Sequence, residues 1–194
     1  MENRTIVFAT SNPHKVKELN EIMAHAGVTF VLPDNNFNPI EDGKTFLENS
    51  KCKALAASDC ETRGYNYFLA DDSGLCVDYL KGEPGIKSAR YEKTPELRIK
   101  KLLKNMEKAD NRTAHFTCAL TLCDKNGKII YQTEGHCYGS IAKTQSGKNG
   151  FGYDPVFLPD GYEGKTLADL DEDIKNKISH RANALNDFSN HLPF

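Results

Sequence analysis

The sequence predicts an α/β protein, folded as one two-lobed domain over residues 1–194 with a cleft for a substrate. Three observations support this prediction. Short apolar runs typical of buried strands alternate with segments whose apolar residues recur at helical spacing. Residues 112–138 have the form of a β-hairpin around Asn126-Gly127. The chain contains no internal repeat and no long Pro-, Gly- or Ser-rich linker, so its 194 residues can form one shared core.

The N-terminal segment predicts a strand, a tight turn and a helix. Residues 6–9 are apolar, and helical spacing of apolar residues begins after Pro13 and continues to Gly27. Asn12 can cap this helix, with Pro13 at its first position. A helix N-terminus that also carries Lys15 offers backbone N–H groups and a positive charge to an anion. An ordinary capped helix without a ligand would explain the same residues.

A second strand over residues 28–32 and a polar loop to Gly43 precede the next predicted helix. That helix begins at Thr45 with the capping-box pattern Thr45-x-x-Glu48 and continues through Ala57. Glu41, at the end of the loop, has two interpretations. Its charge can favour the N-terminus of the helix, or its carboxylate can reach a metal ion shared with Asp72.

The central feature is the acidic sequence that follows the apolar run 67–70. Adjacent residues on a strand point to opposite faces, so Asp71 and Asp72 can serve one ligand only if the backbone bends. We expect a bend at Ser73-Gly74, after which a strand resumes over residues 75–80. One carboxylate would then face the cleft and hold a cation such as Mg²⁺, while the other accepts supporting hydrogen bonds. The alternative is a β-turn capped by its own Asp residues.

The remaining sequence predicts a third helix from Thr94 to Met106 and a last helix after Ser179. Residues 147–155 form a glycine-rich loop, and we expect the hairpin to serve as scaffold without chemistry of its own. Phe151 and Tyr153, on the flexible loop, are suited to stacking on a flat base. The alternative is that these aromatic side chains fold back onto the core.

Composition narrows the class of protein. A net charge of −2 argues against a general nucleic-acid binder, and no apolar run is long enough to span a membrane. We expect no signal peptide. The six cysteines lack Cys-x-x-Cys spacing and indicate reduced thiols in a cytoplasmic protein.

Taken together, several motifs resemble the inosine triphosphate pyrophosphatase family, whose members are also called non-standard purine nucleoside triphosphate pyrophosphatases. The resemblance extends in matching order from Val7 to about Leu185. It rests on Thr10-Ser11-Asn12-x-x-Lys15-x-x-Glu18, Glu41, Ala70-Asp71-Asp72-Ser73-Gly74-Leu75, Pro84-Gly85-x-x-Ser88-Ala89-Arg90-Tyr91, Gly150-Phe151-Gly152-Tyr153-Asp154-Pro155 and Ser179-His180-Arg181. Many members have Gly in place of Ser11, so here the turn must adopt a conformation that Ser tolerates.

The resemblance implies a mixed sheet with flanking helices, two lobes, a homodimer, and Mg²⁺-dependent hydrolysis of ITP, dITP and XTP to the monophosphate and pyrophosphate. It implies Asp72 as the catalytic carboxylate, with Glu41 and Asp72 as metal ligands. The implied substrate-binding residues are Thr10, Ser11, Asn12, Pro13, His14, Lys15 and Ser73 at the phosphates, and Phe151, Gly152, Tyr153, Asp154, Lys175, His180 and Arg181 at the base and sugar.

Two other classes stay open on the sequence. The Maf-like nucleotide pyrophosphatases typically have Ser-x-Ser-Pro-Arg-Arg in the N-terminal loop, which residues 10–15 fit poorly. A nucleotide sensor that binds without turnover would not need a water-orienting carboxylate such as Asp72.

Overall fold

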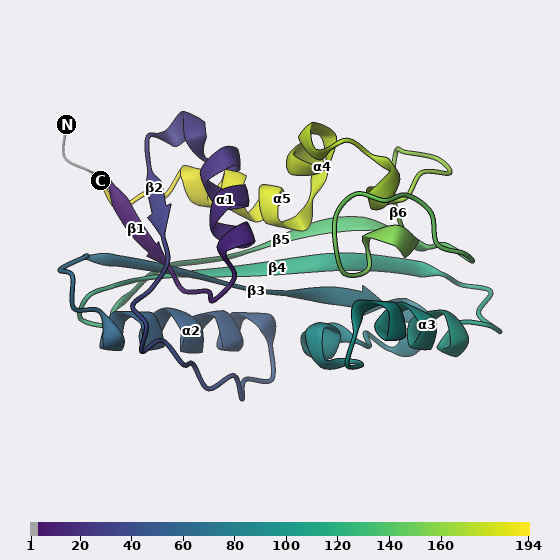
Figure 1. Cartoon of the computed structure of the whole chain (residues 1–194), viewed down its shortest axis with the longest axis horizontal. Helices are drawn as coiled ribbons and strands as arrows, with labels where there is room; N and C mark the ends of the chain where they lie inside the picture. The colour runs from purple at the N-terminus through teal and green to yellow at the C-terminus, as the bar shows by residue number, and fades with distance from the viewer. Residues whose placement is uncertain (1–3) are drawn as a thin grey trace. The chain divides into compact units, whose positions relative to one another are not determined.

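The computed structural model describes residues 4–194, and its strands form one six-stranded sheet in the order β2-β1-β3-β4-β5-β6 (Figure 1). The parallel pairs β1–β2 and β1–β3 and the antiparallel pair β5–β6 make the sheet mixed, as the resemblance implies. The strands are β1 (Thr5–Phe8), β2 (Thr29–Val31), β3 (Tyr67–Val77), β4 (Thr113–Asp124), β5 (Ile129–Ile141) and β6 (Phe157–Pro159).

Five α-helices and five 3-10 helices accompany the sheet in the described chain. The α-helices are α1 (Pro13–Ile22), α2 (Phe46–Cys60), α3 (Pro95–Asn105), α4 (Glu172–Ile178) and α5 (His180–Ser189). The 3-10 helices are η1 (Ala24–Ala26), η2 (Asp78–Leu80), η3 (Gly85–Arg90), η4 (Asp154–Val156) and η5 (Leu167–Asp169). Within residues 4–194, none of the helices has the length and apolar character needed to cross a membrane.

The chain divides into two compact units. Unit 1 comprises the described part of Met1–Asp72 together with Cys118–Gly135 and Arg181–Phe194. Unit 2 comprises Ser73–Thr117 and His136–His180. Strands β3, β4 and β5 each contribute residues to both units, and β3 passes from unit 1 to unit 2 directly after Asp72.

Unit 1 has helices on both faces of its strands. Helices α1 and α5 pack on one face, where Leu19 and Leu185 join a buried cluster with Leu69 of β3. Helix α2 lies on the opposite face, where Ala54 packs with Phe68 (Figure 1). Neighbouring residues of β3 therefore contribute to different cores, as expected for a strand buried on both sides.

Unit 2 has its own buried cluster. Apolar side chains of α3, including Leu102, pack with Val77 of β3, Phe116 of β4 and Phe157 of β6. The rings of Phe116 and Phe157 are tilted, with centroids 4.7 Å apart. This core supports the glycine-rich loop and the segment before α5.

The structure confirms the principal helix and turn signals. The hydroxyl of Thr45 accepts a hydrogen bond from the N–H of Glu48 at the start of α2, and Thr94 caps α3 in the same way. Gly27 ends the first helical segment in the left-handed region, with φ of 63°. Gly127 has φ of 74° in the turn between β4 and β5. Glycine adopts this left-handed conformation readily, as the Asn-Gly pair predicts for a hairpin turn.

Two local predictions are wrong. The predicted bend at Ser73-Gly74 is absent, since β3 continues without interruption from Tyr67 to Val77 and ends in η2 rather than in a strand to Leu80. Ser73-Gly74 lies beyond the residues of β3 that pair with β1, and the place of β3 beside β4 in the sheet outweighs the turn preference of this Ser-Gly pair. The sequence interpretation also missed α4, a short helix that ends directly before Ser179.

Candidate active site

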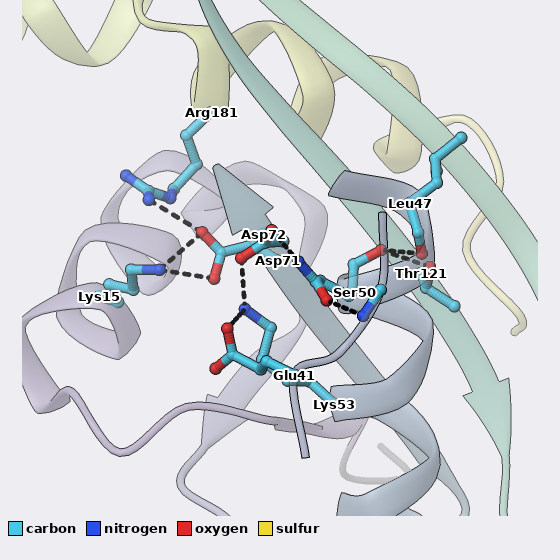
Figure 2. A network of polar contacts seen from close by, with 11 residues as sticks. Lys15, Glu41, Leu47, Ser50, Lys53, Asp71, Asp72, Thr121 and Arg181 are labelled. Atoms are coloured by element: carbon cyan, nitrogen blue, oxygen red, sulfur yellow. Dashed lines mark hydrogen bonds and ion pairs between the residues drawn. The ribbon is translucent and has the colours of Figure 1, made fainter. Parts of the chain in front are cut away.

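The continuous course of β3 decides where its two carboxylates lie. Because the strand does not bend, Asp71 and Asp72 point to opposite faces of the sheet. Asp71 faces α1 and α5, whereas Asp72 faces α2 (Figure 2). Asp71 is 1% exposed and Asp72 is 9% exposed. The sheet therefore separates the two acids without the predicted turn.

Asp71 is held by two cations in the interior of unit 1. The Lys15 ammonium donates to both carboxylate oxygens, at 2.8 and 2.9 Å. The Arg181 guanidinium donates to Oδ2 at 2.9 Å and, through its other terminal nitrogen, to Glu18 at 3.0 Å. Arg181 is 2% exposed. The four charged groups connect α1, β3 and α5 in one buried network.

Asp72 is held by residues of α2. The Lys53 ammonium donates to Oδ1 at 2.8 Å, and the Asn49 amide donates to Oδ2 at 3.2 Å. The ammonium also lies 3.8 Å from Glu41 Oε2, so it sits between two carboxylates (Figure 2). Glu41 and Asp72 thus lie beside the same lysine ammonium, and their role as a metal pair stays a prediction.

The loop that carries Glu41 is fixed at Gly43. Its N–H donates to Asn49 Oδ1 at 2.9 Å, and a β-carbon at this position would lie 2.7 Å from the same oxygen. Only glycine permits this approach. Asn49 therefore orients Asp72 with its amide nitrogen and anchors the Glu41 loop with its amide oxygen.

Burial and neighbouring charges shift the pKa values of these acids in opposite directions. Burial alone would raise the pKa of Asp71, but Lys15 and Arg181 hold it well below its usual range, so Asp71 is a permanent anion. Burial raises the pKa of Asp72, and Lys53 offsets only part of that effect. Of the two acids, Asp72 is therefore the better proton acceptor.

The predicted phosphate-binding segment lies at the N-terminus of α1. The Thr10 hydroxyl accepts the N–H of Asn12 at 3.1 Å, which shapes the turn before the helix. Ser11, Asn12 and Pro13 are exposed at that helix end. The side chain of His14 lies outside what the structure describes. Backbone groups at a helix N-terminus beside Lys15 are suited to an anion.

A second predicted group lies in unit 2. Asp154 Oδ2 accepts the N–H of Phe151 at 2.8 Å and the Lys175 ammonium at 2.7 Å. The same ammonium lies 4.4 Å from the centroid of the Phe151 ring, which is 57% exposed. Gly150, with φ of 74°, allows the loop to turn tightly around the carboxylate.

The other residues predicted for base and sugar have different surroundings. Tyr153 is buried in the core of unit 2, and its hydroxyl donates to the Ser88 carbonyl at 3.0 Å. The His180 ring stacks on Phe116, with centroids 4.9 Å apart. Ser73 and Gly152 are partly exposed in unit 2. Arg181 belongs to unit 1, where its guanidinium contacts acids.

The sequence analysis missed Lys53 and Asn49. Both lie on the buried face of α2, four residues apart and beside the apolar Ala54 and Ala57. A lysine and an asparagine among the core positions of a helix are a signal that could have been found, because such groups stay buried only with partners. The pairing of Arg181 with Glu18, 163 residues apart, has no comparable sequence signal.

The mixed α/β fold thus combines two carboxylate–lysine pairs with a helix N-terminus, and groups of this kind are suited to a phosphorylated ligand. The sequence model of the Ham1 family matches residues 6–191, and the chain belongs to that family. This membership decides against the Maf-like alternative.

Relatives and solved structures agree with this assignment. A dITP/XTP pyrophosphatase of Desulforamulus reducens is 43% identical over 188 residues, covering 93% of this chain and 91% of the relative. The dITP/XTP pyrophosphatase of Methylacidiphilum infernorum is 42% identical, covering 92% and 89%. The Staphylococcus aureus Ham1 protein has a TM-score of 0.84 at 36% identity, covering 96% of each chain. A Ham1 protein from Coxiella burnetii has a TM-score of 0.82 at 37% identity, with the same coverage.

Asp71→Asn is expected to destabilise unit 1 strongly, because it leaves two cations without their shared anion. Removing one partner of a buried ion pair typically costs about 3–5 kcal/mol. Urea denaturation measures the loss. Glu21→Gln, which breaks the exposed pair of Lys17 and Glu21, is the control and should cost less than ~1 kcal/mol. Equal effects of the two variants would contradict the assigned role of Asp71.

Gly43→Ala is expected to displace the loop that carries Glu41, since the added β-carbon meets the side chain and backbone of Asn49. The free energy of unfolding should change little, because the loop is polar and partly exposed. Nucleotide hydrolysis should fall by ~10-fold or more, in line with the sensitivity of catalysis to small misplacements. The exposed neighbour Lys44→Ala is the control. Unchanged hydrolysis by Gly43→Ala would show that the position of Glu41 does not matter.

Proposed function

We propose that this chain hydrolyses the non-standard purine nucleoside triphosphates dITP, XTP and ITP to the monophosphate and pyrophosphate, removing them from the nucleotide pool. Membership of the Ham1 family and the names of its relatives support the proposal. The observation that carries it is Asp72, a buried carboxylate of raised pKa oriented by Lys53 and Asn49. A sensor that only binds nucleotides would not need such a group.

The donor set of Glu41 and Asp72 fits Mg²⁺. Both are carboxylates, the ligands that this hard cation prefers, and both already lie within 4 Å of the single positive charge of Lys53. We propose that these two side chains hold the ion. When bound, Mg²⁺ would supply positive charge to neutralise phosphate oxygens as the anhydride breaks.

The residues around the acids supply the other parts of the reaction. Lys15 and the N-terminus of α1 bind the departing pyrophosphate and offset its negative charge. The oxygen of a water molecule attacks the α-phosphorus, and the bond from that phosphorus to the α–β bridging oxygen breaks. The bridging oxygen leaves with the electron pair as part of pyrophosphate. Asp72 accepts the proton of the attacking water.

For the base, the structure favours Phe151 over Tyr153 as the stacking ring. Phe151 is exposed on its loop, whereas Tyr153 is committed to the core. We propose that donors of the Ser179-His180-Arg181 segment bind the 6-oxo group that hypoxanthine and xanthine share. Because the Arg181 guanidinium contacts Asp71 and Glu18, Arg181→Ala would disturb the acidic network as well as any contact to the base.

The family resemblance further supports a homodimer. The weakly negative net charge supports a protein that does not bind nucleic acid. The cytoplasm is the compartment that suits buried thiols such as Cys118 and Cys123, whose pKa values burial raises to about 12.

Asp72→Asn is expected to fold and to lose turnover by ~10²–10⁴-fold, the usual contribution of a positioned general base. Hydrolysis of ITP in ¹⁸O-labelled water, with product analysis, tests both the residue and the reaction. The label should enter the monophosphate, with unlabelled pyrophosphate as the second product. Label in orthophosphate, with accumulation of a diphosphate, would overturn the proposed reaction.

Phe151→Ala is expected to lower kcat/KM for ITP and XTP by ~10–100-fold, because stacking on an aromatic ring contributes about 1–3 kcal/mol per base. Tyr138→Ala is the control, since Tyr138 is an equally accessible aromatic residue of unit 2, 60% exposed.

ATP should be a poor substrate of the unaltered enzyme, because the 6-amino group of adenine would face the hydrogen-bond donors that we propose for the 6-oxo group. Hydrolysis of ATP as fast as ITP would contradict the 6-oxo contact.

A further inference from the structure

The motif Ser88-Ala89-Arg90-Tyr91 has no part in the reaction proposed above, yet it borders a hollow in the surface of unit 2. The hollow has a volume of about 510 Å³ and lies between the end of η3 and the first turn of α3. Its lining consists of Ala89, Arg90, Tyr91, Glu92, Lys93 and Arg98. Three of these six residues are cations and one is an acid.

The backbone of this loop is held from two sides. Ser88 Oγ accepts the N–H of Leu75 at 2.9 Å and donates to the Gly85 carbonyl at 2.6 Å. The carbonyl of Tyr91 accepts the Lys101 ammonium at 2.9 Å, and Tyr91 Oη accepts the Asn105 amide at 2.8 Å. The loop is therefore anchored to both β3 and α3 before any ligand binds.

The cations on this anchored loop are available to a ligand. Arg90 and Lys93 are exposed, and within residues 4–194 their side chains form no hydrogen bond or ion pair. Among the described residues, the guanidinium of Arg98 donates only from Nε, to the Glu92 carbonyl at 2.9 Å, and this bond fixes the plane of the group. The one acid of the hollow, Glu92, is paired with Lys101 at 3.2 Å. The lining therefore carries more positive than negative side chains, and the nearby carboxylate of Glu96 offsets part of the charge of Arg98.

Two guanidinium groups and an ammonium around one hollow match the chemistry of a phosphoryl group. Guanidinium binds phosphate oxygens through paired hydrogen bonds, and lysine adds a mobile charge. The volume falls within the range of small-molecule sites and exceeds what a single phosphate requires. A ligand with two or more linked phosphates fits both the charge and the size.

We propose that Arg90, Lys93 and Arg98 form a binding site for a linked-phosphate anion, such as inorganic pyrophosphate or the phosphate tail of a nucleotide. The site lies within unit 2 and uses none of the acidic residues assigned to the reaction. Its rigid backbone means that little ordering accompanies binding.

NMR titration of the whole chain with inorganic pyrophosphate tests the proposal. The backbone amides of residues 89–93 and the side-chain Nε–H of Arg98 are expected to shift on binding. Arg90→Gln and Lys93→Gln should each weaken that response by ~10-fold or more, the effect of losing one hydrogen bond to a charged group. Lys87→Gln is the matched control, because Lys87 is also an exposed cation of η3 and does not line the hollow.

Three results would overturn the proposal. The first is the absence of shifts at residues 89–93 with millimolar pyrophosphate. The second is an equal response in Arg90→Gln and the unaltered chain. Loss of the shifts in Lys15→Gln but not in Arg90→Gln would likewise show that they report binding at the α1 N-terminus only.

Titration of the Asp72→Asn variant with ITP identifies the source of the phosphates without turnover. If a nucleotide tail occupies the hollow, ITP shifts residues 89–93 at lower concentration than pyrophosphate does. If the free product occupies it, pyrophosphate acts at lower concentration. Either order supports a linked-phosphate site, and neither depends on whether the chain hydrolyses ITP.

Discussion

The buried carboxylate of Asp71 is the charge on which the arrangement of unit 1 depends. Lys15 from α1 and Arg181 from α5 both donate to it, and Arg181 is in turn paired with Glu18. The buried Arg181 guanidinium would be strongly unfavourable without an anion, and the partly exposed Lys15 ammonium is paired with the same carboxylate. The network therefore fixes two helices to β3, and it holds Lys15 beside the N-terminus of α1, where the proposed pyrophosphate leaves.

The alternation of side chains along β3 then determines the place of the second acid. Since Asp71 faces α1 and α5, Asp72 must face α2, where Lys53 and Asn49 donate hydrogen bonds to its carboxylate. The polar stripe of α2 continues to Ser50, whose hydroxyl pairs with Thr121 of β4 at 2.7 Å (Figure 2). The straight strand thus carries a permanent anion, Asp71, that stabilises the scaffold, and a more basic carboxylate, Asp72, to which we assign the proposed reaction.

Unit 2 divides its aromatic and basic residues in a similar way. Within one glycine-rich loop, Tyr153 is buried and stabilises the core, whereas Phe151 stays exposed over Lys175. At the end of η3, Tyr91 anchors the backbone, whereas the exposed Arg90 side chain forms no hydrogen bond or ion pair within residues 4–194. In both loops, one residue supplies rigidity and a neighbour remains available for a ligand. Preorganisation of this kind lowers the cost of binding.

The sequence by itself determined the mixed α/β class, the capped starts of α2 and α3, the hairpin and the family, because caps, turns and periodicity are local signals. The resemblance implied Glu41 and Asp72 as a metal pair, and this role stays a prediction. Only the tertiary structure decided that β3 runs straight through Ser73-Gly74, that Asp71 pairs with Arg181, and that Asp72 is held by Lys53. The place of β3 beside β4 in the sheet outweighs a local turn preference at Ser73-Gly74. Contacts between residues more than a hundred positions apart exist only once the chain has folded.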